Sequence, residues 1–144
     1  MPSATRPSIH HIALTVTDLD ASIEWYEKVF DIKYLMEEGH KGGTGKVLAD
    51  DAWQLMIVLH RHDSNGGETF AETRTGLDHV GLAVPSRTDL EAWQAHLEQM
   101  GVERSSAADR PCTQSPIVDR PYGSVLVFRD PDNVQLEMFA PPSS

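Results

Sequence analysis

The feature that most constrains this chain is an internal repeat. The stretch IHHIALTVTD, at residues 9–18, returns 68 positions later as DHVGLAVPS, at residues 78–86. When His11 is aligned with His79, the apolar residues that follow coincide, and so do Trp25 and Trp93. A repeat of roughly 70 residues is longer than a solenoid unit but fits a duplicated half-domain. The sequence therefore predicts two similar modules.

Strand alternation explains why these residues match. Successive side chains of an extended strand point to opposite faces, so each repeated histidine shares its face with every second residue. These neighbours are small, for example Ala13 in the first copy and Gly81 in the second, while the opposite face is branched and apolar. The apolar face is suited to packing under a helix. The histidine face leaves open volume beside an imidazole, as expected of a pocket wall.

Composition excludes several classes of partner. The chain has 144 residues, is 40% hydrophobic and carries a formal net charge of −10. A chain of this length buries a real core, whereas nucleic acids and anionic membranes require basic patches that are missing here. No apolar run is long enough to span a bilayer, no secretory signal pattern is visible, and Cys112 has no partner for an internal disulfide. We therefore expect a cytoplasmic protein that binds neither nucleic acid nor membrane.

The order of patterns along the chain predicts its organisation. We expect an N-terminal tail over 1–8, a first module over 9–62, a linker over 63–76, a second module over 77–140 and a C-terminal tail over 141–144. The predicted strands are 9–17, 32–36, 46–49, 53–60, 77–84, 123–129 and 134–140. One helix begins after a capping Asp18 or Asp20 and runs to about Phe30, and another ends at Gly101. The proline-containing stretch 104–122 is predicted to be a long loop. A loop of this length is unusual in a compact domain unless it covers another part of the molecule.

The ends of the two modules give a second set of matches. Gln54 aligns with Gln135 and Met56 with Glu137, at an offset of 81. A carboxylate on a strand that is otherwise suited to burial needs a partner, because burying an unpaired charge is costly. If the modules pack symmetrically, His11, His79 and Glu137 converge. Two histidines and one carboxylate make a facial triad that holds one divalent metal ion and leaves positions open for substrate.

At this point the chain resembles a known superfamily. The paired motifs HIALTVTDL and HVGLAV, a helix after each, and the closing DPDNVQLE are similar to those of the vicinal oxygen chelate superfamily, which includes glyoxalases, bleomycin resistance proteins and extradiol dioxygenases. The resemblance covers residues 9–140. It implies an α+β fold of two tandem βαβββ modules that form a cupped, partly closed mixed β-sheet around a metal site. It also makes His11, His79 and Glu137 the metal positions.

The resemblance leaves the reaction open. Lyase and epimerase members have a fourth ligand, Gln or Glu, where this chain has Met56, and fosfomycin transferases have a threonine where it has Ala13. The function it implies is a divalent-metal-dependent enzyme, either a lyase or isomerase, a dioxygenase or a transferase, that acts on a small oxygen-chelating substrate. The metal is Fe, Mn, Ni, Zn or Co, and a homodimer is expected. The alternative is a metal-free protein that binds or sequesters a small molecule, as bleomycin resistance proteins do.

We also predict which residues take part in catalysis and which contact the substrate. Glu137 and Tyr122 are the catalytic candidates, and Tyr122 either donates a proton or hydrogen bond to substrate or packs the base of its loop. Gln54, Met56 and Phe139 are expected to contact substrate. The remaining histidines are interpreted as surface or rim residues. Among them, the spacing His60-Arg61-His62 could recruit a metal ion, but no third ligand is evident nearby in the sequence.

Overall fold

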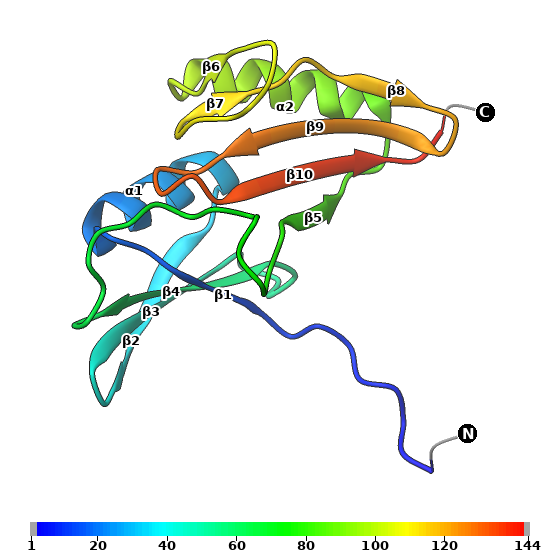
Figure 1. Cartoon of the computed structure of the whole chain (residues 1–144). Coiled ribbons are helices and arrows are strands. Elements are labelled where there is room, and N and C mark those ends of the chain that lie inside the picture. Colours follow the sequence, from blue (N-terminus) through cyan, green and yellow to red (C-terminus); the bar gives the residue numbers. More distant parts are fainter. Residues whose placement is uncertain (1–2, 143–144) are drawn as a thin grey trace. The chain divides into compact units, whose positions relative to one another are not determined.

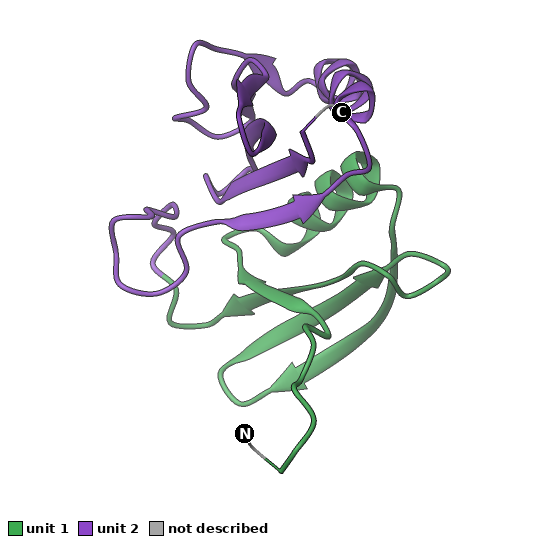
Figure 2. Cartoon of the chain, turned by 90° about the vertical axis from the view of Figure 1, so that its right-hand side faces the viewer, with its two compact units in different colours: residues 1–65 green, residues 66–144 purple. Residues whose placement is uncertain are grey.

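The computed structural model describes residues 3–142 and divides into two compact units, with the boundary between Asn65 and Gly66 (Figure 2). The first unit contains β1 (Ile12–Thr15), α1 (Leu19–Phe30), β2 (Lys33–His40), β3 (Gly43–Ala49) and β4 (Met56–His62). The second contains β5 (Val80–Ala83), α2 (Arg87–Gln99), β6 (Glu103–Arg104), β7 (Thr113–Gln114), β8 (Val118–Arg120), β9 (Gly123–Arg129) and β10 (Gln135–Ala140) (Figure 1). No helix among residues 3–142 has the length and apolar character needed to cross a membrane.

The first unit is one four-stranded sheet with a helix on one face. Its strand order is β1-β4-β3-β2, with β1 parallel to β4 and the other pairs antiparallel. The apolar side chains of alternate residues, such as Leu14, Ile57 and Leu59, are buried together with Tyr26 and Val29 of α1. Burial of this stripe removes apolar surface from water and is the main stabilising term of the unit. The opposite face of the sheet carries polar side chains, among them His60 and His62 of β4.

The second unit repeats this plan with additions. Its sheet has the order β5-β10-β9-β7-β6, β8 also pairs with β9, and β5 is parallel to β10. Leu90 and Leu97 of α2 are fully buried, as are Leu126 and Phe128 of β9. Helix α2 thus covers one face of the β9–β10 pair, as α1 covers β3 and β4 in the first unit (Figure 1). The predicted α+β fold of two modules built on a βαβββ plan is confirmed.

Both helices begin at capping side chains. Asp18 Oδ1 accepts a hydrogen bond from Ala21 N at 3.1 Å, and Ser86 Oγ accepts one from Asp89 N at 3.3 Å. Each bond gives one backbone N–H of the first helical turn a side-chain acceptor. Asp18 is therefore the cap of α1, and it is one of the two capping residues that the sequence predicted. At the far end of α2, Gly101 has a φ of 86°, which a residue without a Cβ adopts at little cost.

The stretch 104–122 is more regular than predicted. It contains β7 and β8, which both pair antiparallel with β9. The interior of this stretch is anchored by Gln114, whose side chain is fully buried and donates from Nε2 to Val102 O at 3.0 Å. The sequence pattern missed these strands because they are only two and three residues long and show no alternation. Strands this short depend on the strands beside them.

An ion pair fixes residues of the predicted linker to the second unit. Arg129 is buried, with 7% of its side chain exposed, and its Nη1 and Nη2 donate to Glu72 at 2.9 and 2.7 Å. Arg129 also donates from Nε to Ala108 O at 2.6 Å and from Nη1 to Asn133 O at 3.1 Å. The guanidinium holds the pKa of Glu72 at about 2, from an ordinary value of 4.5. Residues 66–76 are thus connected to the end of β9 by a charged contact.

Candidate metal sites

His79 and Glu137 lie side by side within the second unit. His79 precedes β5, Glu137 lies in β10, and the two strands are parallel neighbours. The distance from His79 Nε2 to Glu137 Oε2 is 3.2 Å, and the two side chains are 38% and 21% exposed. Two ligand atoms that each lie about 2.1 Å from one ion are separated by roughly 3 Å. The spacing of this pair is therefore that of two neighbouring ligands of one metal ion.

The residues around His79 and Glu137 also suit the binding of a metal ion. His79 Nδ1 lies 2.7 Å from Asp78 Oδ1, which fixes the ring with its Nε2 beside Glu137. A carboxylate on the far nitrogen of a metal-binding histidine is a common second contact, since it orients the ring and raises its basicity. Glu137 is flanked in register by Gly81 on β5 and Val127 on β9. A Cβ added at Gly81 would meet no atom within 4 Å, so the space beside the carboxylate is open.

His11 lies in the first unit, directly before β1. Its side chain is exposed, and its Nδ1 is 2.9 Å from Nδ1 of His10. Within residues 3–142 no group of three or more His, Cys, Asp or Glu side chains is arranged to hold a metal ion. The structure thus brings two of the three predicted ligands together, and the role of His11 is taken up as a proposal below.

The turns before β4 and β10 reveal which positions of the repeat correspond. Asp50 closes the first turn by accepting from Leu55 N at 2.7 Å, and Asp130 closes the second by accepting from Val134 N at 2.8 Å. The first turn is one residue longer than the second. Gln54 occupies this extra length, in an exposed bend before β4. It is therefore outside the strand in which it was predicted.

The sheet registers give the same correspondence. Ile12 pairs with Ile57 in the first unit, and Val80 pairs with Leu136 in the second, so Ile57 is equivalent to Leu136. The residue equivalent to Glu137 is therefore Val58, and the equivalent of Met56 is Gln135. The predicted alignment of Met56 with Glu137 is shifted by two residues, because it matched the letters Gln-Leu of the two modules and these letters do not occupy equivalent strand positions. Met56 itself is half-buried at the start of β4.

Tyr122 and Phe139 form a stacked pair in the second unit. Their ring centroids are 6.2 Å apart with an interplanar angle of 9°, and Tyr122 is 64% exposed. Phe139 shares a strand face with Glu137, two residues away. The pair provides an apolar, flat surface on the same strand as the carboxylate, where a small ligand could pack.

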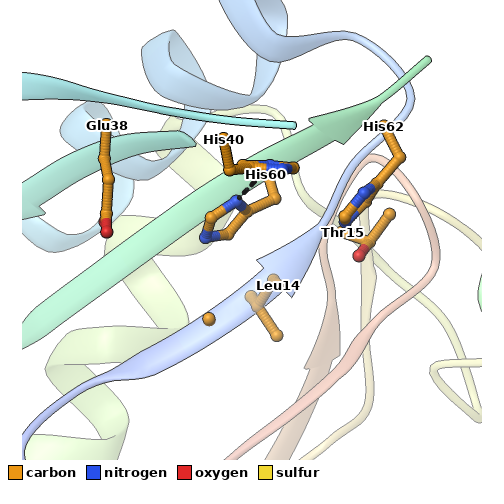
Figure 3. A pocket seen from close by; sticks show the side chains of 7 residues that line it. Leu14, Thr15, Glu38, His40, His60 and His62 are labelled. Carbon is orange, nitrogen blue, oxygen red and sulfur yellow. Dashed lines mark hydrogen bonds between the residues drawn. The ribbon is translucent and has the colours of Figure 1, made fainter. Parts of the chain in front are cut away.

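A second group of polar side chains, of which the sequence indicated only His60 and His62, lies in the first unit. His40 of β2 and His60 and His62 of β4 line a pocket of about 330 Å³ together with Glu38, Ala13, Leu14 and Thr15 (Figure 3). His60 Nδ1 is 3.2 Å from His40 Nε2. The pKa of His60 is lowered, first because burial disfavours its charged form and then because His40 and His62 are close. The alternation His60-Arg61-His62 was visible in the sequence, but His40 joins it only through strand pairing.

Comparisons with known proteins agree with this architecture. Residues 8–138 match the family model of the glyoxalase/bleomycin resistance protein/dioxygenase superfamily. A crystal structure of a glyoxylase/bleomycin resistance protein/dioxygenase domain from Frankia sp. EAN1pec has 33% sequence identity and a TM-score of 0.82, covering 97% of this chain and 96% of that one. The fosfomycin resistance protein FosX from Listeria monocytogenes, in complex with Mn(II) and 1S,2S-dihydroxypropylphosphonic acid, has 20% identity and a TM-score of 0.59, with 94% and 93% covered. This last likeness concerns the fold alone.

A curated relative is the metallothiol transferase FosB from Bacillus licheniformis, which is 27% identical over 94 residues. The match covers 65% of this chain and only 54% of that protein. The repeated βαβββ plan, the histidine that precedes the first strand of each unit and the family match over residues 8–138 lead to one conclusion. The chain belongs to the glyoxalase/bleomycin resistance protein/dioxygenase superfamily.

Proposed function

We propose that this protein is a divalent-metal-dependent enzyme that acts on a small, oxygen-chelating substrate, with His11, His79 and Glu137 as its metal ligands. The observation that carries the proposal is the pair of His79 Nε2 and Glu137 Oε2 at 3.2 Å, with Asp78 orienting the histidine. His11 is added because it holds the same place before β1 as His79 holds before β5. FosX binds Mn(II), and FosB is a metallothiol transferase, which supports a metal-dependent activity.

Each residue has a definite part in this proposal. A bound divalent ion would supply Lewis acidity that stabilises negative charge on substrate oxygen. His79, held by Asp78, and Glu137 provide one imidazole nitrogen and one carboxylate oxygen without rearrangement. The stacked rings of Phe139 and Tyr122 would hold the apolar part of a substrate, and the exposed Tyr122 hydroxyl is free to reach it as a hydrogen-bond donor. A cytoplasmic homodimer completes the proposal.

The first experiment measures Mn²⁺ binding by electron paramagnetic resonance on untagged protein purified without chelators. Mn²⁺ is chosen because a mixed set of imidazole and carboxylate ligands suits it better than imidazoles alone. We expect one ion per chain, and we expect His11→Ala, His79→Ala and Glu137→Gln each to weaken binding roughly 10-fold or more, which is about 1.4 kcal/mol. His96→Ala, on α2, is the matched histidine control and should bind Mn²⁺ like the wild type.

The same titration distinguishes the alternatives. If only His79→Ala and Glu137→Gln lose Mn²⁺, His11 is not a ligand. If all three variants bind Mn²⁺ like the wild type, the metal assignment is wrong, and a metal-free binding protein of the bleomycin resistance type becomes the better description.

A further inference from the structure

Three imidazoles gather on one face of the first unit. His40 comes from β2, and His60 and His62 come from β4, with β3 between the two strands. The ring centroids of His40 lie 5.1 Å from those of both His60 and His62, and the centroids of His60 and His62 are 6.0 Å apart. Figure 3 shows the three rings beside one another. Protonated imidazoles at this spacing repel one another. The cluster is therefore favourable only when its rings are neutral, which is the form in which imidazole binds a metal ion.

We propose that His40, His60 and His62 form a second metal site, suited to Zn²⁺ or to another borderline ion such as Co²⁺ or Ni²⁺. All of its ligands lie in the first unit, and none of them is a ligand of the site proposed above. The inference goes beyond the proposed function and does not depend on it.

His40 and His60 already have the spacing of two ligands. Their nearest nitrogens, His40 Nε2 and His60 Nδ1, are 3.2 Å apart. Two nitrogens at about 2.0–2.1 Å from one zinc ion are roughly 3.0–3.4 Å apart for angles between 90° and the tetrahedral value. Without metal, a proton on one of these nitrogens bridges the pair, and with metal the ion would take its place.

The backbone prepares His40 for this role. Its Nδ1 lies 3.2 Å from Lys41 O, so Nδ1 carries the proton and Nε2 keeps its lone pair directed at His60. A backbone carbonyl on the far nitrogen is a usual way to fix the tautomer of a metal-binding histidine. His40 is therefore held in the form that a metal ion requires.

His62 completes the set after a side-chain rotation. Rings that bind one ion through their nitrogens have centroids roughly 4.5–5.3 Å apart, given metal–nitrogen distances of about 2.1 Å. The spacing of 5.1 Å to His40 meets this range, whereas 6.0 Å to His60 is slightly too long. This agrees with the finding that no three such side chains of residues 3–142 are arranged to hold an ion. Two ligands are in place, and the third lies within reach.

Two glycines make room for the rings. A Cβ at Gly45 would lie 2.7 Å from Cε1 of His60, and a Cβ at Gly43 would lie 2.7 Å from Cε1 of His40. Both glycines belong to β3, which separates the strands that carry the histidines. Their missing side chains allow the imidazoles to lie across the strand and approach one another.

The ligand chemistry selects the class of ion. Imidazole donors suit Zn²⁺, Co²⁺ and Ni²⁺, and three of them leave a fourth position open. This position would face the pocket of about 330 Å³ that Thr15 and Glu38 also line. The neighbouring cation Lys46 pairs with Glu37 at 3.2 Å, and Arg61 alternates to the other face of β4. Neither opposes a positive ion in the pocket.

The test uses the full chain with the other proposed ligands removed, as the variant His11→Ala/His79→Ala/Glu137→Ala. Co²⁺ is titrated and followed by visible absorption, because tetrahedral Co²⁺ absorbs far more strongly than hydrated Co²⁺, and Zn²⁺ is then added in competition. We expect one Co²⁺ per chain with an intense tetrahedral spectrum. Adding His40→Ala, His60→Ala or His62→Ala should weaken binding by roughly 10- to 100-fold, and adding His10→Ala should change nothing.

Gly45→Ala provides a test that keeps every ligand. Its Cβ should displace the His60 ring and weaken Co²⁺ binding, while circular dichroism reports an intact fold. The proposal is overturned if Co²⁺ gives no tetrahedral spectrum, or if any of the three histidine substitutions leaves the affinity unchanged, since the binding would then be adventitious. It is also overturned if Gly45→Ala binds Co²⁺ as tightly as its parent.

Discussion

The parallel pairs β1–β4 and β5–β10 use the same register but carry different chemistry. Val58 and His60 on β4 occupy the positions that Glu137 and Phe139 occupy on β10. In the second unit a carboxylate stands at the first of these positions and an aromatic ring at the second. In the first unit the order is an apolar residue, then an imidazole. The duplicated backbone therefore fixes where a side chain can stand, and single substitutions decide which position becomes polar.

The two units also differ in how their sheets are tied to neighbouring segments. In the second unit, Arg129 at the end of β9 pairs with Glu72 and with three further acceptors. The register makes Ala49 of β3 the equivalent residue in the first unit. A small side chain there makes no such connection. A buried charge thus stabilises one copy of the repeat, while the other copy depends on apolar packing at the same place.

The largest expected effect comes from placing the carboxylate of the second unit into the first. Val58 is 3% exposed, so Val58→Glu should lower the free energy of unfolding by roughly 3 kcal/mol in metal-free protein. Met56→Glu, two residues earlier, is the matched variant and should cost less than about 1 kcal/mol, because Met56 is only half-buried. Urea unfolding with and without Mn²⁺ measures both.

Metal should reverse part of the loss in one variant only. In Val58→Glu the new carboxylate is related to His11 as Glu137 is to His79, so Mn²⁺ should restore stability. The correspondence between Val58 and Glu137 is contradicted if Mn²⁺ stabilises Met56→Glu and leaves Val58→Glu unaffected.

A smaller effect is expected from acid, and it should be confined to the second unit. Because the pKa of Glu72 is lowered from 4.5 to about 2, its ion pair contributes fully above pH 4.5 and is lost as the pH falls towards 2. Glu72→Gln should therefore be less stable than the wild type at pH 7, and the difference should shrink between pH 4.5 and 2. Thermal unfolding over this range measures it. A difference that stays constant with pH would show that the carboxylate charge is not what stabilises the contact.

The smallest expected effect compares the caps of the two helices. Asp18→Ala and Ser86→Ala should each cost about 1 kcal/mol, because each removes the acceptor for one N–H of the first turn. The cost at Asp18 should be the larger at pH 7, since its negative charge also interacts with the positive end of the helix dipole. Urea unfolding of the two variants provides the measurement. Equal costs at pH 7 would assign no contribution to the charge.

The sequence by itself determined the repeat, both helices and most strands. β9 was predicted with its observed bounds, Gly123–Arg129, and Asp18 was one of two predicted caps. These features depend on local periodicity and on hydrogen bonds between residues near one another in the chain, which is information that a sequence displays directly. His79 and Glu137 could also be paired in advance, because the repeat marks the first and the closing strand marks the second.

Only the tertiary structure decided the contacts between residues far apart in the chain. Strand pairing makes Val58, and not Met56, the equivalent of Glu137, although the letters Gln-Leu recur at 54–55 and 135–136. Strand pairing brought His40 to His60, and the course of residues 66–76 brought Glu72 to Arg129. The physical reason is that strand pairing, unlike helix formation, joins residues whose separation in sequence is arbitrary. Register and turn length therefore decide which side chains meet.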